Sequence, residues 1–120
     1  MRLNYLTSIS AAALMAAGAV QAEPLKIGVL ATLEGTYTVL GEDSVRGFEL
    51  ALKEWGDKAG GREIEYVVAS TDTSPDSAVR AARKVVEQDG VDIVIGPLSG
   101  SEGIAIRDYS KTVPGVTFIN

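Results

Sequence analysis

The sequence predicts an α/β domain built as β-α-β-α-β-α-β around a mainly parallel sheet. Short apolar runs alternate with amphipathic helical patterns, and glycine-rich or polar turns separate them. Strands that are joined through helices cannot pair as hairpins, so they pair in parallel with right-handed crossovers. We expect the strand order 2-1-3-4, in which the order reverses between the first and third strands.

The first strand is predicted at residues 25–32, a nearly continuous apolar run, and the first helix at about residues 39–58. The helix carries apolar residues at intervals of three, four and three: Val45, Phe48, Leu52 and Trp55. This spacing places them on one face, so we expect that face, Trp55 included, to belong to the core. Gly60-Gly61 is expected to end the helix, because glycine accepts the left-handed backbone of a helix terminus.

The second strand, residues 63–69, leads through a polar loop into a second helix. Ser74 and Pro75 mark the start of this helix, because serine caps helices and proline is tolerated at the first helical position. The helix extends to about residue 89 and has an apolar stripe, formed by Ala78, Val79, Ala82, Val85 and Val86. The third strand follows at residues 91–95.

The loop at residues 96–103 leads into a third helix, at about residues 102–111, and a fourth strand at residues 116–119 ends the sequence. Ser99 and Glu102 stand three residues apart, which is the spacing of a capping box. A parallel strand that is buried on both faces needs cover on each side. Because no helix follows the fourth strand, we expect the chain to be the first part of a larger domain.

Residues 1–22 have the pattern of a cleaved secretory signal peptide. Arg2 supplies the positive charge, an Ala-rich apolar stretch covers residues 9–20, and Val-Gln-Ala at residues 20–22 fits a cleavage site. A membrane-spanning helix is the alternative, but it needs about 20 apolar residues. Cleavage after Ala22 would leave one domain, residues 23–120, in the periplasm, and because no Cys follows the cleavage site we expect no lipid anchor on an N-terminal Cys.

The composition favours binding over catalysis. The chain has no Cys and no His, which excludes disulfides, thiolate metal sites, thiol nucleophiles and the usual general base. We find no calcium loop, phosphate loop or nucleophile elbow, and we expect no cofactor. Beyond Ala22 the chain has sixteen acidic and ten basic residues, a net charge of −6, which disfavours nucleic acid as a partner.

The loops at residues 32–41 and 96–103 flank the reversal of strand order, where parallel sheets bind ligands. Both are rich in Gly, Ser and Thr, and both lead into helix N-termini, whose free N–H groups favour an anion such as a carboxylate. The residues that we expect to contact a ligand are Tyr37, Leu40, Leu98, Ser99, Gly100 and Ser101. Two alternatives stay open: Ser99 only caps its helix, and Leu40 belongs to the apolar face of its helix. Asp72 is expected to accept hydrogen bonds from backbone donors of its own loop.

A series of short motifs follows the predicted elements. They are Ile27-Gly28-Val29-Leu30 with Gly35 and Gly41, then Gly47, Gly60-Gly61, Asp72 with Ser74-Pro75, and Val91-Asp92-Ile93-Val94-Ile95-Gly96-Pro97. No single motif is decisive. Their order and spacing together resemble the periplasmic solute-binding proteins of ABC importers, of the branched-chain amino acid (leucine/isoleucine/valine) type, over all of residues 23–120.

The resemblance implies a longer, two-lobed protein that closes around its ligand, with residues 23–120 as the first half of lobe one of a type I fold. In relatives that bind aliphatic amino acids, a hydroxyl and backbone N–H groups after the third strand hold the ligand carboxylate. By position that hydroxyl falls on Gly100, between Ser99 and Ser101, which is a departure from the family pattern.

The function expected from this resemblance is that of a binding component, not an enzyme. It would capture a small carboxylate-bearing solute, such as a branched-chain amino acid, and deliver it to an ABC permease in the inner membrane. Two alternatives remain. A ligand-sensing receptor ectodomain could have the same fold, and a secreted α/β hydrolase would need a His or a metal site that this sequence lacks.

Overall fold

The computed structural model describes residues 22–120, so the predicted signal peptide lies outside the described residues except for Ala22. None of the helices in this part of the chain is both long and apolar enough to cross a membrane. The elements are, in chain order, β1 (Leu25–Thr32), α1 (Thr38–Trp55), β2 (Lys58–Ala59), β3 (Arg62–Thr71), α2 (Pro75–Arg83), the π-helical turn η1 (Lys84–Gln88), β4 (Ile93–Ile95), α3 (Gly100–Ser110) and β5 (Thr117–Ile119).

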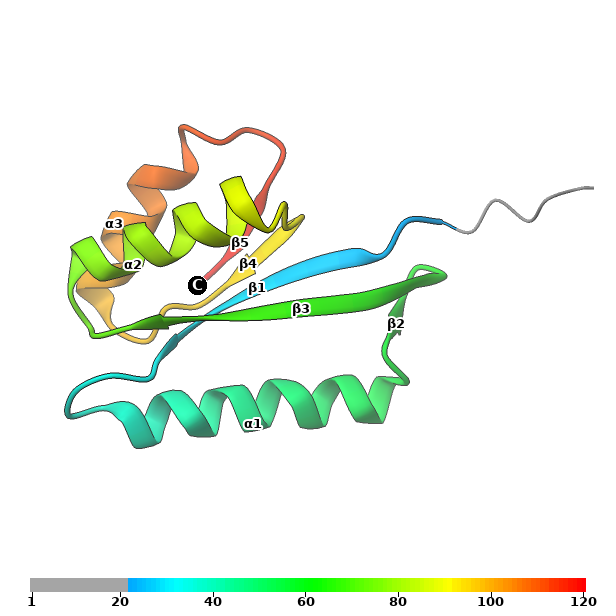
Figure 1. Cartoon of the computed structure of the whole chain (residues 1–120), viewed down its shortest axis with the longest axis horizontal. Helices are drawn as coiled ribbons and strands as arrows, with labels where there is room; N and C mark the ends of the chain where they lie inside the picture. Colours follow the sequence, from blue (N-terminus) through cyan, green and yellow to red (C-terminus); the bar gives the residue numbers. More distant parts are fainter. Residues whose placement is uncertain (1–21) are drawn as a thin grey trace, which may run out of the picture.

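The strands form one sheet in the order β2-β3-β1-β4-β5 (Figure 1). The strands β3, β1, β4 and β5 run parallel, and β1 lies between β3 and β4, with Ile27 opposite both Tyr66 and Ile93. The order 2-1-3-4 that was predicted for the helix-separated strands is therefore confirmed. The short strand β2 was not predicted; it pairs antiparallel with the start of β3.

The helix α1 ends earlier than predicted. Gly56 has a φ of 77° at its C-cap and stops it directly after Trp55. Gly60 and Gly61 instead form the two-residue turn between β2 and β3, with φ values of 58° and 77°. Such turns have positive φ at both positions, which glycine adopts without steric cost. The prediction that Gly60-Gly61 ends the helix is wrong, because a nearer glycine already does so.

The core lies between one face of the sheet and the helices α2 and α3. The predicted stripe of the second helix is confirmed, since Ala78, Ala82 and Val85 are fully buried and Val79 and Val86 pack against them. The buried cluster consists of Leu30, Ala69, Ala78, Ala81, Ala82, Val85, Val91, Val94, Ile106 and Tyr109. Small residues along α2 let the helix approach the sheet closely.

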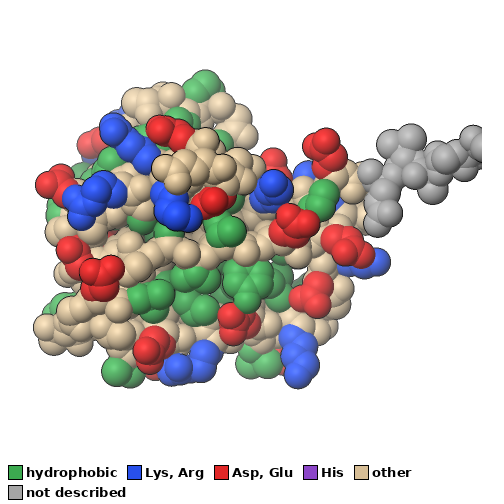
Figure 2. All heavy atoms as spheres, in the orientation of Figure 1, with side chains coloured by type: hydrophobic (Ala, Val, Ile, Leu, Met, Phe, Trp, Pro, Cys, Tyr) green, Lys and Arg blue, Asp and Glu red, His purple; other side chains and the backbone are tan. Residues whose placement is uncertain are grey.

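Among residues 22–120, only α1 covers the other face of the sheet (Figure 1). Phe48 packs edge-to-face on Tyr66, with ring centroids 5.2 Å apart, and Figure 2 shows apolar side chains gathered between α1 and the sheet. Trp55, however, is 81% exposed, so its predicted place in the core is wrong. Phe118 faces Tyr109 of α3, which directs the half-exposed Ile119 to the α1 side. On that side, no helix of the described part of the chain lies over β5.

Two glycines of α1 offer a matched test of its packing. A Cβ on Gly41 would collide with the backbone carbonyl of Thr32, whereas a Cβ on Gly47 would meet nothing within 4 Å. We expect Gly41→Ala to destabilise the fold by about 1–3 kcal/mol through overpacking. Gly47→Ala should stabilise it by about 0.5–1 kcal/mol through helix propensity. Urea unfolding of the protein, expressed from its complete reading frame, measures both; equal effects would contradict this packing.

The incomplete cover on the α1 side of the sheet predicts how residues 23–120 behave when they are expressed alone. Residues 23–120, expressed alone, should unfold over a broad temperature range and bind a hydrophobic dye, because Trp55 and Ile119 are exposed there. Circular dichroism during heating checks this expectation. A sharp, cooperative transition from a monomer would show that one helix is sufficient cover for that face.

Candidate functional site

Three loops meet at the carboxyl ends of β1, β3 and β4. They are residues 33–37, 72–74 and 96–99, and each leads into the N-terminus of a helix. Ligands of parallel α/β sheets bind at this end, where the strand order reverses. A cavity of about 350 Å³ lies there, lined by Tyr37, Leu40, Thr73, Leu98, Ser99 and Ser101. Five of the six predicted contact residues thus line one cavity; Gly100 does not.

Ser99 forms the cap of α3. Its Oγ accepts a hydrogen bond from the N–H of Glu102 at 3.4 Å, and its own N–H donates to Oε2 of Glu102 at 3.1 Å. The Ser99 hydroxyl lies 2.8 Å from the same carboxylate oxygen. A hydroxyl has only one proton to donate. The nearby carboxylate oxygen is the strongest acceptor available to it. The capping box predicted from the sequence is therefore confirmed, and Ser99 has no proton free for a ligand.

Ser101 is the freer of the two hydroxyls. Its side chain is exposed at the cavity, with Oγ 3.3 Å from Ser99 Oγ and 3.4 Å from the carbonyl oxygen of Thr73. Both distances are long for hydrogen bonds between oxygen atoms. Its proton can therefore turn to a bound solute at small cost.

The first turn of α3 also offers backbone donors. The capping box uses the N–H groups of Ser99 and Glu102, and within residues 22–120 no hydrogen bond uses those of Gly100 and Ser101. The fully buried Glu102 carboxylate complements the positive end of the helix dipole, and its Oε1 has no hydrogen-bond partner in the described part of the chain. The helix end thus offers two directed donors to an oxygen atom.

The opposite wall of the cavity is apolar. Tyr37 and Leu40 come from the start of α1, and Leu98 comes from the loop before α3. All three are about half exposed, with Leu40 at 50%. Leu40 therefore belongs to the cavity and not to the buried face of α1. Among residues 22–120, no group of three or more potential ligands is placed to hold a metal ion, so the cavity combines apolar surface with neutral hydrogen-bonding groups.

The third loop contributes Thr73, which was not among the predicted site residues. Beside it, Oδ1 of Asp72 accepts a hydrogen bond of 2.8 Å from the N–H of Ser74, which confirms that this carboxylate serves backbone donors of its own loop. Hydrogen bonds with Ser74 and Ser77 lower the pKa of Asp72 to about 2. Asp72 and Ser74-Pro75 indicate a turn before α2, but nothing in their pattern shows which side chain of the turn faces the cavity.

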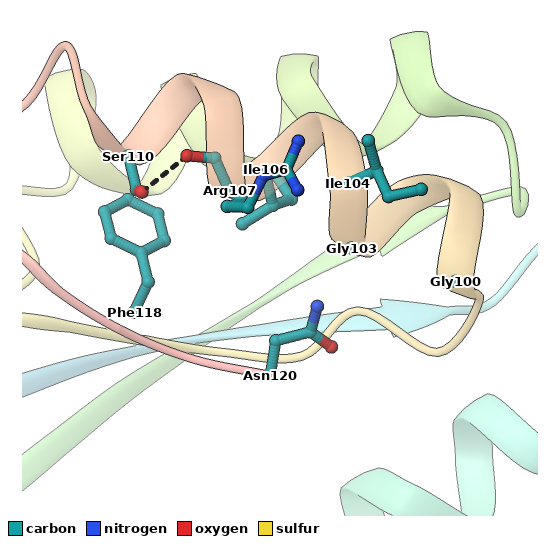
Figure 3. A pocket seen from close by; sticks show the side chains of 8 residues that line it. All are labelled: Gly100, Gly103, Ile104, Ile106, Arg107, Ser110, Phe118 and Asn120. Atoms are coloured by element: carbon teal, nitrogen blue, oxygen red, sulfur yellow. Dashed lines mark hydrogen bonds between the residues drawn. The ribbon is translucent and has the colours of Figure 1, made fainter.

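A larger hollow of about 430 Å³ lies between α3 and β5 (Figure 3). It is lined by Gly100, Gly103, Ile104, Ile106, Arg107, Ser110, Phe118 and Asn120. Asn120 points toward α3, and its side-chain amide lies against Gly103, where a Cβ would require that amide to move. The hollow follows the edge strand β5 rather than the reversal of strand order. We therefore place the candidate site in the smaller cavity.

The sequence profile of the periplasmic binding protein family matches residues 24–116. The chain belongs to this family. A Leu/Ile/Val-binding protein homolog from Brucella suis is 29% identical over 109 residues, which are 90% of this chain and 27% of that protein. The chain spans about a quarter of the length of the curated relatives of this kind that it matches.

Solved structures agree with this family. An ABC transporter substrate-binding protein from Sphaerobacter thermophilus is 36% identical with a TM-score of 0.69, over 74% of this chain and 24% of that one. A solute-binding protein from R. palustris, solved in complex with benzoate, is 31% identical with a TM-score of 0.68, over 74% of this chain and 25% of that one. The fold is that of a type I periplasmic binding protein.

The two serines of the cavity should differ in their effect on stability. Ser99→Ala removes a cap and should lower the free energy of unfolding by about 1 kcal/mol. Ser101→Ala removes only long contacts of an exposed side chain and should change it by less than about 0.5 kcal/mol. Urea unfolding of the protein from its complete reading frame measures both. An equal loss for Ser101→Ala would show that this hydroxyl is structural.

Proposed function

We propose that the protein containing this chain captures a small carboxylate-bearing solute, such as an amino acid, in the periplasm and delivers it to an ABC permease of the inner membrane. The observation that carries the proposal is the cavity at the carboxyl ends of β1, β3 and β4. It brings the Ser101 hydroxyl, at the first turn of α3, opposite an apolar wall, in a chain of the periplasmic binding protein family.

The chemistry of the cavity fits a solute with two unlike ends. The N–H group and the hydroxyl of Ser101 suit the two oxygens of a carboxylate. Tyr37, Leu40 and Leu98 suit a hydrocarbon or aromatic remainder. The names of similar proteins mention Leu/Ile/Val and benzoate, and each of these compounds combines a carboxylate with an apolar group.

Export supports the same proposal. The pattern of residues 1–22 predicts a cleaved signal peptide, and a periplasmic carrier needs such a signal. The net charge of −6 predicted for residues 23–120 disfavours adhesion to anionic lipid surfaces. We infer a carrier that diffuses between the two membranes and meets its permease by docking.

Titration calorimetry tests the proposal on the protein expressed from its complete reading frame. The panel contains the amino acids together with aliphatic and aromatic acids, and at least one member should bind. Ser101→Ala should weaken that binding by about tenfold, since a hydrogen bond to a charged group contributes about 1.5–3 kcal/mol.

Ser110→Ala is the control on the same helix. Its hydroxyl donates to the carbonyl of Arg107 at 2.8 Å and does not line the candidate cavity, so this change should leave the affinity unaltered. A protein that binds no member of the panel would contradict the proposed function.

A further inference from the structure

We propose that Thr73 is a specificity-determining residue of this cavity, one that selects solutes by their size. The inference rests on the proposed function, because it assumes that the cavity receives the solute. Thr73 is the only residue of the loop between β3 and α2 that lines the cavity, and it does so together with residues of the other two loops, such as Tyr37 and Ser101. The predicted site contained residues of the other two loops only.

The backbone of Thr73 is unusual for its residue type. Its φ is 74°, a left-handed conformation in which Cβ crowds the following carbonyl, and which glycine or asparagine adopts far more readily. Threonine is branched at Cβ and is among the residues least suited to it. Such conformations persist where the surroundings enforce them and often occur at binding sites. A turn that needed only the backbone shape would be made more stable by glycine.

The surroundings of Thr73 hold it from both sides. On one side, Asp72 accepts a hydrogen bond from Ser74, which caps α2. On the other, the carbonyl of Thr73 lies 3.3 Å from the Ser99 hydroxyl and 3.4 Å from that of Ser101. These contacts join the loop to the start of α3 across the cavity. The left-handed backbone turns the carbonyl toward the serines, and in our proposal the side chain takes up space in the cavity that Thr73 lines.

The backbone and the side chain of Thr73 have different roles in this proposal. The carbonyl contacts depend on the backbone, which glycine can reproduce. The occupied space depends on the side chain, which glycine lacks. Thr73→Gly should therefore keep the loop in place and enlarge the cavity, while Thr73→Asn also accepts positive φ and fills the space again.

Competition among four probes tests the inference on the protein from its complete reading frame: L-leucine, L-phenylalanine, benzoate and 4-hydroxybenzoate. The probes form two pairs, leucine with the larger phenylalanine and benzoate with the larger 4-hydroxybenzoate. In a pair, Thr73→Gly should raise the affinity for the larger probe relative to the smaller one by about tenfold, as expected for added space of about one methylene or more. It should also raise the unfolding midpoint. Thr73→Asn should return the ratio to within about threefold of the wild type.

Asp57→Gly is the matched control. Asp57 also has a positive φ, 55°, but it lies beyond the far end of α1 and does not line the cavity. This change should leave every affinity ratio as in the wild type. If the wild type binds some probes and Thr73→Gly leaves their ratios unaltered, the role of Thr73 is structural and the inference alone fails. If the wild type binds none of the four probes, the inference fails, whereas the proposed function fails only if no member of the full calorimetry panel binds.

Discussion

β1 pairs with β3 over eight residues and with β4 over three, always in parallel. Parallel pairing places the carboxyl ends of all three strands at the same edge of the sheet, and the loops that follow them have to share that space. The buried position of β1 on both faces fixes this register, because a slip by one residue would exchange its two faces. The cavity, its polar side and its apolar side all depend on this pairing.

Local signals in the sequence were sufficient for most helix starts. Ser74-Pro75 and the pair Ser99 and Glu102 act within four residues of one another, so their hydrogen bonds follow from the order of residues alone. The strand order was also predictable, since helical crossovers restrict how strands can pair.

Features that depend on distant contacts were not predictable in this way. Trp55 has helical spacing from Phe48, but its burial requires a neighbour above that part of the sheet, and the described residues provide none. Gly60-Gly61 could end a helix or turn a hairpin, and the nearer Gly56 decided between them. Thr73 lines the cavity because its loop lies beside Ser99 and Ser101 of another loop, a contact between segments far apart in the sequence.

The buried carboxylate of Glu102 limits what the cavity can hold. It occupies the first turn of α3 and satisfies part of the helix dipole that a solute anion would otherwise use. The remaining attraction comes from directed N–H groups, which depend on geometry more than on charge. A site of this kind favours solutes whose oxygens fit two donors over anions in general.

The carboxylate of Asp72 has a consequence for the behaviour of its loop in acid. An ordinary aspartate loses its charge near pH 4, but the pKa of Asp72 is about 2. Because this pKa is lowered in the folded state, the stabilisation it reflects is present above the ordinary value and disappears only as the pH falls through about 2. The hydrogen bond from Ser74 beside Thr73 therefore keeps a charged acceptor at pH values that protonate an ordinary aspartate.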